Sequence, residues 1–334
     1  MRIVFFGSDE FAATHLEQLL KSNHKIIGCV TQPDRAQGRG MKLVLSPIKV
    51  LAAQHNIDYF QPEILKEASV AQRLKAMNAD IFVVVAYGQI LTQQMLNIPK
   101  LFCVNVHGSL LPKYRGAAPI NWAILNGDTQ TGVSVQKIAL ALDAGDIIAQ
   151  SKMNIAPDMT ADVLRTQMAQ VGAKLLVETL DNIEKGKYKL TPQDPAAVTV
   201  APKLTKDMGK IDWTKSAQQI YNQIRGLKPW PGTYTQHNGK MIKIIDAELR
   251  HCEEAKPTKQ SKEDCFPPLL KLRRTRASLA MTKEKPGKII DAGKQGFTVA
   301  CGQGALLITQ VQPEAGKIMP AASFIAGHKL DFFI

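Results

Sequence analysis

Short runs of β-branched and aromatic residues alternate with helix-like segments over the first half of the chain. The apolar runs predict strands at Arg2–Phe6, Lys25–Val30, Asp80–Ala86, Cys103–Val106 and Val133–Ile138. Apolar residues at helical spacing predict helices at Phe11–Ser22, Ile48–His55 and Ala161–Glu184. Because strands and helices alternate, we expect an α/β domain with a Rossmann-like, doubly wound and mainly parallel sheet.

The pattern changes over residues 190–206, where Pro192, Pro195 and Pro202 interrupt a polar run. We expect a first domain of residues 1–189, a linker of residues 190–206 and a second domain of residues 207–334. One helix and several short strands are predicted in that second domain, at Ser216–Leu227, Thr233–Gln236, Met241–Glu248, Lys288–Asp291, Gly296–Val299 and Ala305–Val311. The short strands favour a small β-barrel of the oligonucleotide-binding (OB) kind.

Composition indicates a globular protein away from membranes. The apolar runs, such as Ile81–Ala86, are far shorter than the roughly 20 residues of a membrane-spanning helix. The first residues turn acidic at Asp9 and offer no cleavage site, so we expect a cytoplasmic protein rather than a secreted one. The five cysteines form no C-x-x-C pair, which predicts reduced thiols and no metal site.

Positive charge is concentrated in the second part of the chain. Residues 1–200 hold 20 basic and 17 acidic side chains (+3), and residues 201–334 hold 22 and 12 (+10). Such a surplus attracts polyanions such as nucleic acids, although a merely soluble basic surface explains it equally well. Residues 256–285 hold nine basic and three acidic side chains, and we expect them to form a mobile, solvated surface loop.

The candidate chemistry lies at the end of one predicted strand. Asn105 and His107 are two residues apart, so their side chains share a face at the carboxyl end, where open α/β sheets bind ligands. Asp143 follows the next strand and can reach His107. The first turn carries one glycine, Gly7, where G-x-G-x-x-G requires three, and no Walker A sequence is present. NAD and ATP are therefore poorly supported.

Several motifs resemble those of the formyltransferases that use 10-formyltetrahydrofolate. They are Asn-x-His with Ser-Leu-Leu-Pro at residues 105–112, Asp-x-Gly-Asp at 143–146, Gln-Pro-Asp-Arg at 32–35, Gly-Lys-Ile-Asp-Trp at 209–213 and Arg-Gly-Leu-Lys-Pro-Trp-Pro-Gly at 225–232. The resemblance covers nearly the whole chain and is closest to the branch that acts on tRNA. It implies transfer of a formyl group to the α-amino group of methionyl initiator tRNA, in translation initiation.

The resemblance also implies roles for individual residues. Asn105, His107 and Asp143 would be the catalytic trio, and Ser109, Leu110, Leu111 and Pro112 would bind the tetrahydrofolate. Amide and imidazole donors suit the oxyanion that forms when an amine attacks a formyl carbon. Either His107 or Asp143 could take the proton of the amine.

The glycine-rich segment of residues 35–42 would grip the opened end of the tRNA through three basic side chains, although a plain surface loop is the alternative. These side chains are Arg35, Arg39 and Lys42. We expect a monomer. Two other functions stay open, formylation of a small amine (glycinamide ribonucleotide or an amino-sugar nucleotide) and a catalytically inactive RNA-binding relative.

Overall fold

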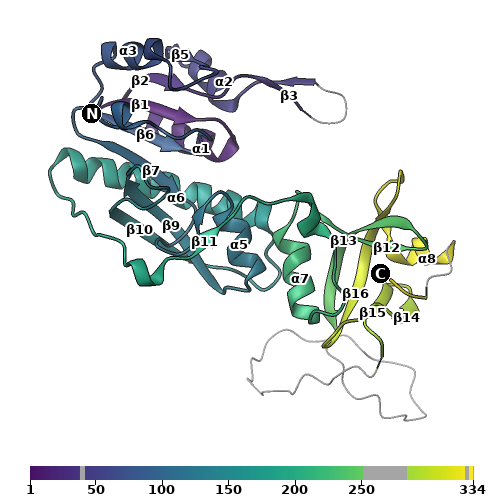
Figure 1. Cartoon of the computed structure of the whole chain (residues 1–334). Coiled ribbons are helices and arrows are strands. Elements are labelled where there is room, and N and C mark those ends of the chain that lie inside the picture. The colour runs from purple at the N-terminus through teal and green to yellow at the C-terminus, as the bar shows by residue number, and fades with distance from the viewer. Residues whose placement is uncertain (38–41, 251–283, 328–330, 334) are drawn as a thin grey trace. The chain divides into compact units, whose positions relative to one another are not determined.

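The computed structural model describes residues 1–37, 42–250, 284–327 and 331–333. The chain divides into two compact units, residues 1–204 and 205–334, and each is described here by itself (Figure 1). Most of the residues expected to form a linker, 190–204, therefore belong to the first unit. The predicted mobile loop of residues 256–285 lies almost wholly outside the described residues.

The first unit is built on a seven-stranded sheet with the order β10-β9-β7-β6-β1-β2-β5. Its strands are β1 (Arg2–Gly7), β2 (Lys25–Val30), β5 (Tyr59–Phe60), β6 (Ile81–Val85), β7 (Cys103–His107), β9 (Gln130–Lys137) and β10 (Ile147–Asn154). The strands from β5 to β7 are parallel, and β9 and β10 are antiparallel at the other edge. The predicted doubly wound, mainly parallel sheet is confirmed.

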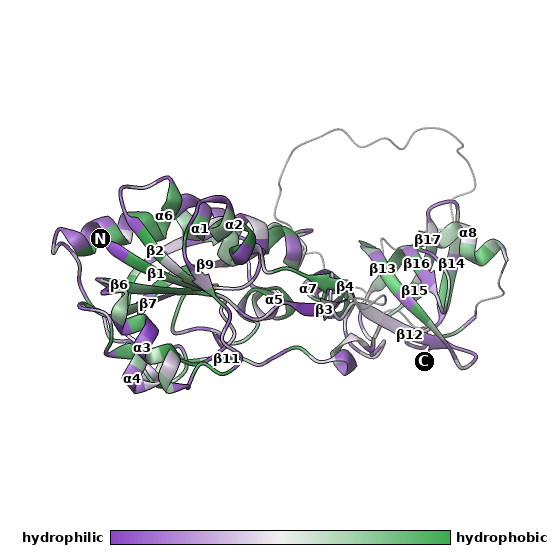
Figure 2. Ribbon diagram, turned by 90° about the horizontal axis from the view of Figure 1, so that it is seen from above, coloured by the Kyte–Doolittle hydropathy of each residue, from purple (hydrophilic) through white to green (hydrophobic). Residues whose placement is uncertain are grey.

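Helices cover both faces of this sheet (Figure 1). One face packs on α1 (Glu10–Leu20), α2 (Pro47–Gln54), α5 (Pro119–Leu125) and α6 (Ala161–Glu184), and the other on α3 (Ala68–Ala76) and α4 (Gln93–Leu96). In β1, Ile3 and Phe5 point to the first face and Val4 and Phe6 to the second. Successive side chains of a strand alternate, so a strand covered on both faces is apolar throughout. Figure 2 shows this as mostly hydrophobic central strands.

Two short pairs of strands complete the first unit. β3 (Arg35–Gln37) and β4 (Lys42–Val44) are antiparallel, and β8 (Arg115–Gly116) pairs in parallel with β11 (Val200–Ala201). The second pair joins the loop after β7 to residues that were expected to form a linker. Between α6 and β11 lies a short 3₁₀ helix, η1 (Pro195–Ala197).

The second unit is a smaller β domain, as predicted, and its sheet is antiparallel. Its strand order is β12-β13-β16-β15-β14, with β17 paired to β16. The elements are η2 (Lys206–Gly209), α7 (Ala217–Gly226), β12 (Thr233–His237), β13 (Lys240–Arg250), β14 (Ile289–Gly293), β15 (Gly296–Ala300), β16 (Ala305–Pro313), β17 (Met319–Pro320) and α8 (Ala321–Ala326). Aromatic rings of Trp213, Phe297 and Phe333 form the centre of its core. None of the described helices of either unit is long and apolar enough to cross a membrane.

Candidate active site

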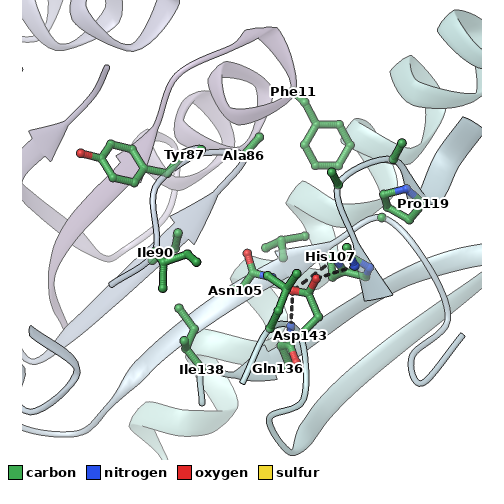
Figure 3. A pocket seen from close by; sticks show the side chains of 18 of the residues that line it. Phe11, Ala86, Tyr87, Ile90, Asn105, His107, Pro119, Gln136, Ile138 and Asp143 are labelled. Atoms are coloured by element: carbon green, nitrogen blue, oxygen red, sulfur yellow. Dashed lines mark hydrogen bonds and ion pairs between the residues drawn. The ribbon is translucent and has the colours of Figure 1, made fainter. Parts of the chain in front are cut away.

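A cavity of about 510 Å³ opens at the carboxyl ends of β6 and β7 (Figure 3). Its wall includes the loop of residues 86–91, the end of β7, the segment from Gly116 to Asn121 and the turn that carries Asp143. This is where an open α/β sheet binds ligands, and the volume suits a small organic molecule. The site predicted from the strand-end residues is therefore a real hollow in the first unit.

The structure brings Asn105, His107 and Asp143 together in this cavity (Figure 3). Oδ1 of Asp143 lies 3.6 Å from Nδ1 of His107 and accepts a hydrogen bond of 3.5 Å from Nδ2 of Asn105. The side chains of His107 and Asp143 are 6% and 11% exposed. Burial strengthens electrostatic interactions among these groups, so a charge that develops here is felt by all three.

Two further groups, both missed from the sequence, hold the carboxylate of Asp143. Oδ1 accepts a hydrogen bond of 3.1 Å from Nε2 of Gln136, and Oδ2 accepts one of 2.9 Å from the backbone N–H of Gly116. Gln136 is a polar side chain of β9, and it is buried. A glutamine within the predicted strand Val133–Ile138 is a signal that sequence reasoning had available.

The turn that carries Asp143 is itself unusual. Asp143 has a φ of 49°, in the left-handed region that side chains other than glycine rarely adopt. At Gly145 an added Cβ would lie 1.7 Å from the carbonyl oxygen of Lys137. The turn therefore approaches β9 so closely that residue 145 must be glycine, and this approach brings the carboxylate over the end of β7.

The hydrogen-bond partner of His107 shows which of its ring nitrogens carries the hydrogen. Its Nε2 lies 2.8 Å from the carbonyl oxygen of Tyr114. A carbonyl oxygen only accepts hydrogen bonds, so Nε2 carries the hydrogen and Nδ1 holds the lone pair of the neutral ring. Because Nδ1 faces Asp143, a proton gained at Nδ1 forms a charge-assisted contact with the carboxylate.

Apolar side chains form much of the remaining wall. Figure 3 shows Phe11 and Pro119 on one side and Tyr87, Ile90 and Ile138 on the other. Ile90, Leu140 and Leu142 are 69%, 57% and 61% exposed. Large apolar side chains at the mouth of a polar site are suited to a flat aromatic ligand.

The residues predicted to bind tetrahydrofolate lie in the turn after β7 and are not among those that line the cavity. Ser109 donates from its hydroxyl to the carbonyl oxygen of Lys113 at 2.5 Å. Ser134 donates to the carbonyl oxygen of Ser109, and Gln150 donates to that of Leu111. These bonds hold the turn against β9 and β10. The contact of Ser109, Leu110, Leu111 and Pro112 with folate stays a prediction.

The predicted tRNA-gripping segment coincides with the β3–β4 pair. Arg35 is exposed on β3, Lys42 begins β4, and Arg39 lies outside the described residues. Asp34 anchors the base of the pair, since its carboxylate accepts from Lys49 at 2.5 Å and from Gln61 at 2.9 Å. The hydrogen bond from Lys49 lowers the pKa of Asp34, so the anchor is charged.

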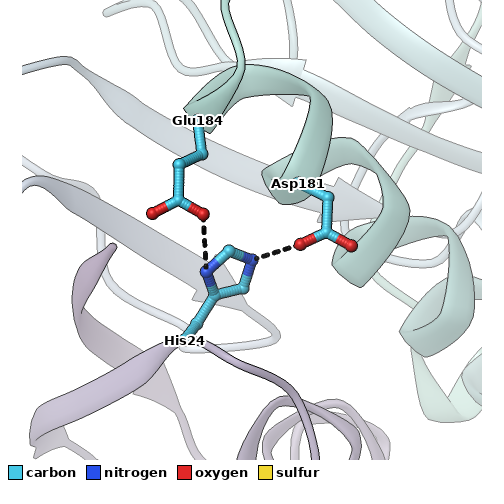
Figure 4. A group of neighbouring side chains, drawn as sticks. All are labelled: His24, Asp181 and Glu184. Carbon is cyan, nitrogen blue, oxygen red and sulfur yellow. Dashed lines mark ion pairs between the residues drawn. The ribbon is translucent and has the colours of Figure 1, made fainter.

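One His, Asp and Glu cluster lies outside the cavity, at the C-terminal end of α6 (Figure 4). Nε2 of His24 is 3.3 Å from Asp181, whereas Nδ1 is 3.8 Å from Glu184. Burial lowers the pKa of His24, so the ion pair here is the one between the N-terminal ammonium of Met1 and Glu184, at 2.7 Å. The cluster joins α6 to the start of the chain.

The cysteines among the described residues take no part in the site. Cys29, Cys103 and Cys301 are buried thiols, and burial raises the pKa of each to about 12. A thiol that stays protonated is a poor nucleophile. This agrees with the prediction of structural thiols.

Family models match both units. The formyl transferase model matches residues 1–180, and the model for the C-terminal domain of formyl transferases matches residues 203–329. The chain is 40% identical over 330 residues to a methionyl-tRNA formyltransferase from Citrifermentans bemidjiense, with 99% of this chain and 94% of that protein covered. A protein of the same name from Moorella thermoacetica is also 40% identical, with 99% and 97% covered.

Solved structures with low sequence identity share the fold. HypX from Aquifex aeolicus in complex with tetrahydrofolic acid aligns with a TM-score of 0.62 at 17% identity, over 100% of this chain and 50% of that one. An N-formyltransferase from Helicobacter canadensis, bound to folinic acid and dTDP-3-aminofucose, aligns with a TM-score of 0.61 at 18% identity, over 92% and 98%.

Proposed function

The chain belongs to the formyltransferase family and is a methionyl-tRNA formyltransferase, and from this premise we propose how its first unit performs the reaction. The formyl donor is 10-formyltetrahydrofolate, and the acceptor is the α-amino group of methionyl initiator tRNA. Similarity over 99% of the chain to methionyl-tRNA formyltransferases favours this acceptor over a small amine and over an inactive RNA-binding role. We place the reaction in the cytoplasm, where translation begins.

The observation that carries this proposal is the convergence of Asn105, His107 and Asp143 in one cavity. When the amine attacks the formyl carbon, a C–N bond forms and the carbonyl oxygen becomes an oxyanion. Nδ2 of Asn105 carries two hydrogens, of which one points to Asp143 and the other is free for this oxygen. A donor so placed contributes about 10²–10³-fold to the rate.

The proton of the attacking amine goes to Nδ1 of His107. Nε2 is committed to the carbonyl oxygen of Tyr114, so Nδ1 holds the lone pair. The imidazolium that forms is stabilised by Asp143, which keeps its own charge. The same proton then passes to the departing folate nitrogen as its bond to the formyl carbon breaks, and His107 is restored.

The folate has an apolar surface to bind. Ile90, Leu140 and Leu142 are exposed side chains on the wall of the cavity, next to the polar trio. An aromatic ring system on these side chains removes their surface from water, which stabilises the complex by roughly 25 cal/mol per Å² of apolar area. This supports a folate donor, and we propose that the turn of residues 109–112, held against β9 by the bond from Ser134 to Ser109, also contacts it.

The acceptor is a macromolecule, and basic groups support its binding. Arg35 and Lys42 begin the two strands of the β3–β4 pair, and the second part of the chain, residues 201–334, carries a charge of +10. Phosphates of a tRNA are the expected partners of such groups. We therefore assign the β3–β4 pair and the exposed basic side chains of the second unit to tRNA binding.

Replacing Asp143 by Asn tests the assigned chemistry. The amide keeps the size of the side chain but removes the charge that stabilises the imidazolium of His107. We expect single-turnover formylation of methionyl-tRNA to fall by about 10²–10⁴-fold. Affinities for folate and tRNA, measured by fluorescence and filter binding, should stay close to those of the unchanged protein. Formylation at the original rate would remove Asp143 from the mechanism.

A further inference from the structure

We propose that Gln193 is a positioning residue for Asp143, an inference that rests on the proposed catalytic role of that carboxylate. Gln193 lies in the segment of residues 191–201, which we call the strap. The strap was expected to be linker, yet it contacts the first unit along its length. At its start Thr191 and Ile147 exchange two backbone hydrogen bonds of 2.9 Å, and near its end β11 pairs with β8.

The amide nitrogen of Gln193 holds the turn that carries Asp143. Nε2 donates to the carbonyl oxygen of Asp143 at 2.8 Å and to that of Gly145 at 2.7 Å. The side chain is buried, with 9% of the residue exposed. Because Asp143 is held at a φ of 49°, in the left-handed region, the turn needs such outside contacts to persist.

The amide oxygen of Gln193 holds the segment on the other side of the carboxylate. Oε1 accepts from Nε of Arg115 at 3.0 Å and from its Nη2 at 2.8 Å. The next residue is Gly116, whose N–H donates to Oδ2 of Asp143. One side chain therefore connects the turn of Asp143 with the segment that supplies its backbone donor.

The end of the strap fixes the same segment from behind. Arg115 donates its N–H to the carbonyl oxygen of Thr199 at 2.9 Å, and Tyr114 donates to Oγ1 of Thr199 at 2.8 Å. Gly116 has a φ of 120°, and an added Cβ would lie 2.7 Å from the carbonyl oxygen of Ala201. The segment that carries the donor to Asp143 and the acceptor for His107 is thus held by the strap.

Two substitutions test this contact, which consists of the bonds donated by Nε2 and the bonds accepted by Oε1. Gln193→Met keeps the length of the side chain and removes both halves. Gln193→Glu keeps an oxygen for Arg115 and places a carboxylate oxygen against the two carbonyl groups. Gln223→Met is the matched control, because Nε2 of Gln223 also joins two carbonyl groups, those of Met208 and Lys210, at 2.7 and 2.9 Å in the second unit.

We expect Gln193→Met and Gln193→Glu each to lower kcat by about 10–100-fold, because small displacements of a catalytic group cost about that much. KM for each substrate should change by less than about twofold, and Gln223→Met should keep kcat within the same limit. The amide proton of Gly116, followed by NMR with ¹⁵N-glycine, should move upfield in both Gln193 variants and stay in place in the control.

Unchanged kcat in Gln193→Met would overturn the proposal, as would full activity of Gln193→Glu or an unmoved Gly116 resonance in either variant. The resonance is read on the folded protein without substrate. The resonance therefore tests the positioning role independently of activity. Failure of the unchanged protein to formylate methionyl-tRNA would contradict the proposed function instead.

Discussion

His107 combines a fixed and a free ring nitrogen. Nε2 is bound to the carbonyl oxygen of Tyr114, which leaves Nδ1 as the proposed acceptor of the amine proton. Removal of the ring takes this group away. We predict that His107→Ala lowers formylation turnover by about 10²–10⁴-fold and leaves tRNA affinity nearly unchanged.

A matched control for this variant is His237→Ala in the second unit. Nδ1 of His237 lies 2.8 Å from the carbonyl oxygen of Phe332, so this substitution also removes a ring bound to a backbone carbonyl. Steady-state assays at saturating tRNA should show normal turnover for it. A His107→Ala protein as active as this control would show that the proton acceptor is misplaced.

His15 is a buried histidine with a structural role in α1. Nδ1 lies 2.7 Å from the carbonyl oxygen of Phe11, and Nε2 has no hydrogen-bond partner among the described residues. Burial lowers the pKa of His15 from 6.5 to about 4. Between these values the unfolded chain binds a proton that the folded chain does not, so stability contributed by neutral His15 is complete above pH 6.5 and falls as the pH drops toward 4.

We therefore predict that His15→Leu flattens the acid side of the stability curve of the first unit. The free energy of unfolding of the unchanged protein should fall by about 3 kcal/mol more than that of the variant between pH 7 and pH 4. Urea unfolding with hydrogen exchange of α1 and β1 peptides measures this at each pH. Parallel pH curves for the two proteins would contradict the burial of a neutral imidazole.

At the scale of elements, the turn between β9 and β10 positions the active-site carboxylate. A methyl group at residue 145 would lie 1.7 Å from the carbonyl oxygen of Lys137, so the backbone of the turn must move. We predict that Gly145→Ala lowers formylation at least about 10-fold, because Asp143 moves with the turn. Gly293→Ala, where an added Cβ meets nothing within 4 Å, is the control. Equal kcat values for the two variants would show that the turn is not a constraint.

Strong periodic patterns made most of these elements predictable. The strands β1, β2 and β6 are mostly apolar because both faces of the sheet are covered, and β7 and β9 each contain β-branched residues. The strands β12 to β16 of the second unit were also predicted within a few residues. The edge strand β10 was missed, since it is half exposed and carries Gln150, Ser151 and Lys152. The helix α3 was missed because it buries only Val70, Ala71 and Leu74 of its nine residues.

The candidate site was also predictable in part. Asn105, His107 and Asp143 stand out because polar groups at strand ends gather at one edge of the sheet. Gln193 gave no signal, since one glutamine in a proline-rich polar run is ordinary for a linker. Its role depends on the pairing of β8 with β11, which joins residues 85 positions apart in the chain.

At the scale of the whole molecule, we expect charge to govern the proposed encounter with tRNA. Each phosphate contact that is lost reduces the slope of log K against log salt concentration by about one unit. We predict that Arg35→Ala, on exposed β3, lowers this slope for methionyl-tRNA by about one unit. Arg73→Ala removes the same charge from α3, where the guanidinium pairs with Asp58, and should leave the slope unchanged. Equal slopes for both variants would contradict the assignment of the β3–β4 pair.

The central claim is the identity of the acceptor, and one assay tests it directly. The full chain is incubated with 10-formyltetrahydrofolate and methionyl initiator tRNA, with uncharged tRNA, free methionine and a small amine such as an amino-sugar nucleotide in parallel. We predict one formyl-methionyl-tRNA for each tetrahydrofolate released, and no product with the other acceptors. Formylation of the small amine alone would contradict the account and leave the basic second unit without a role.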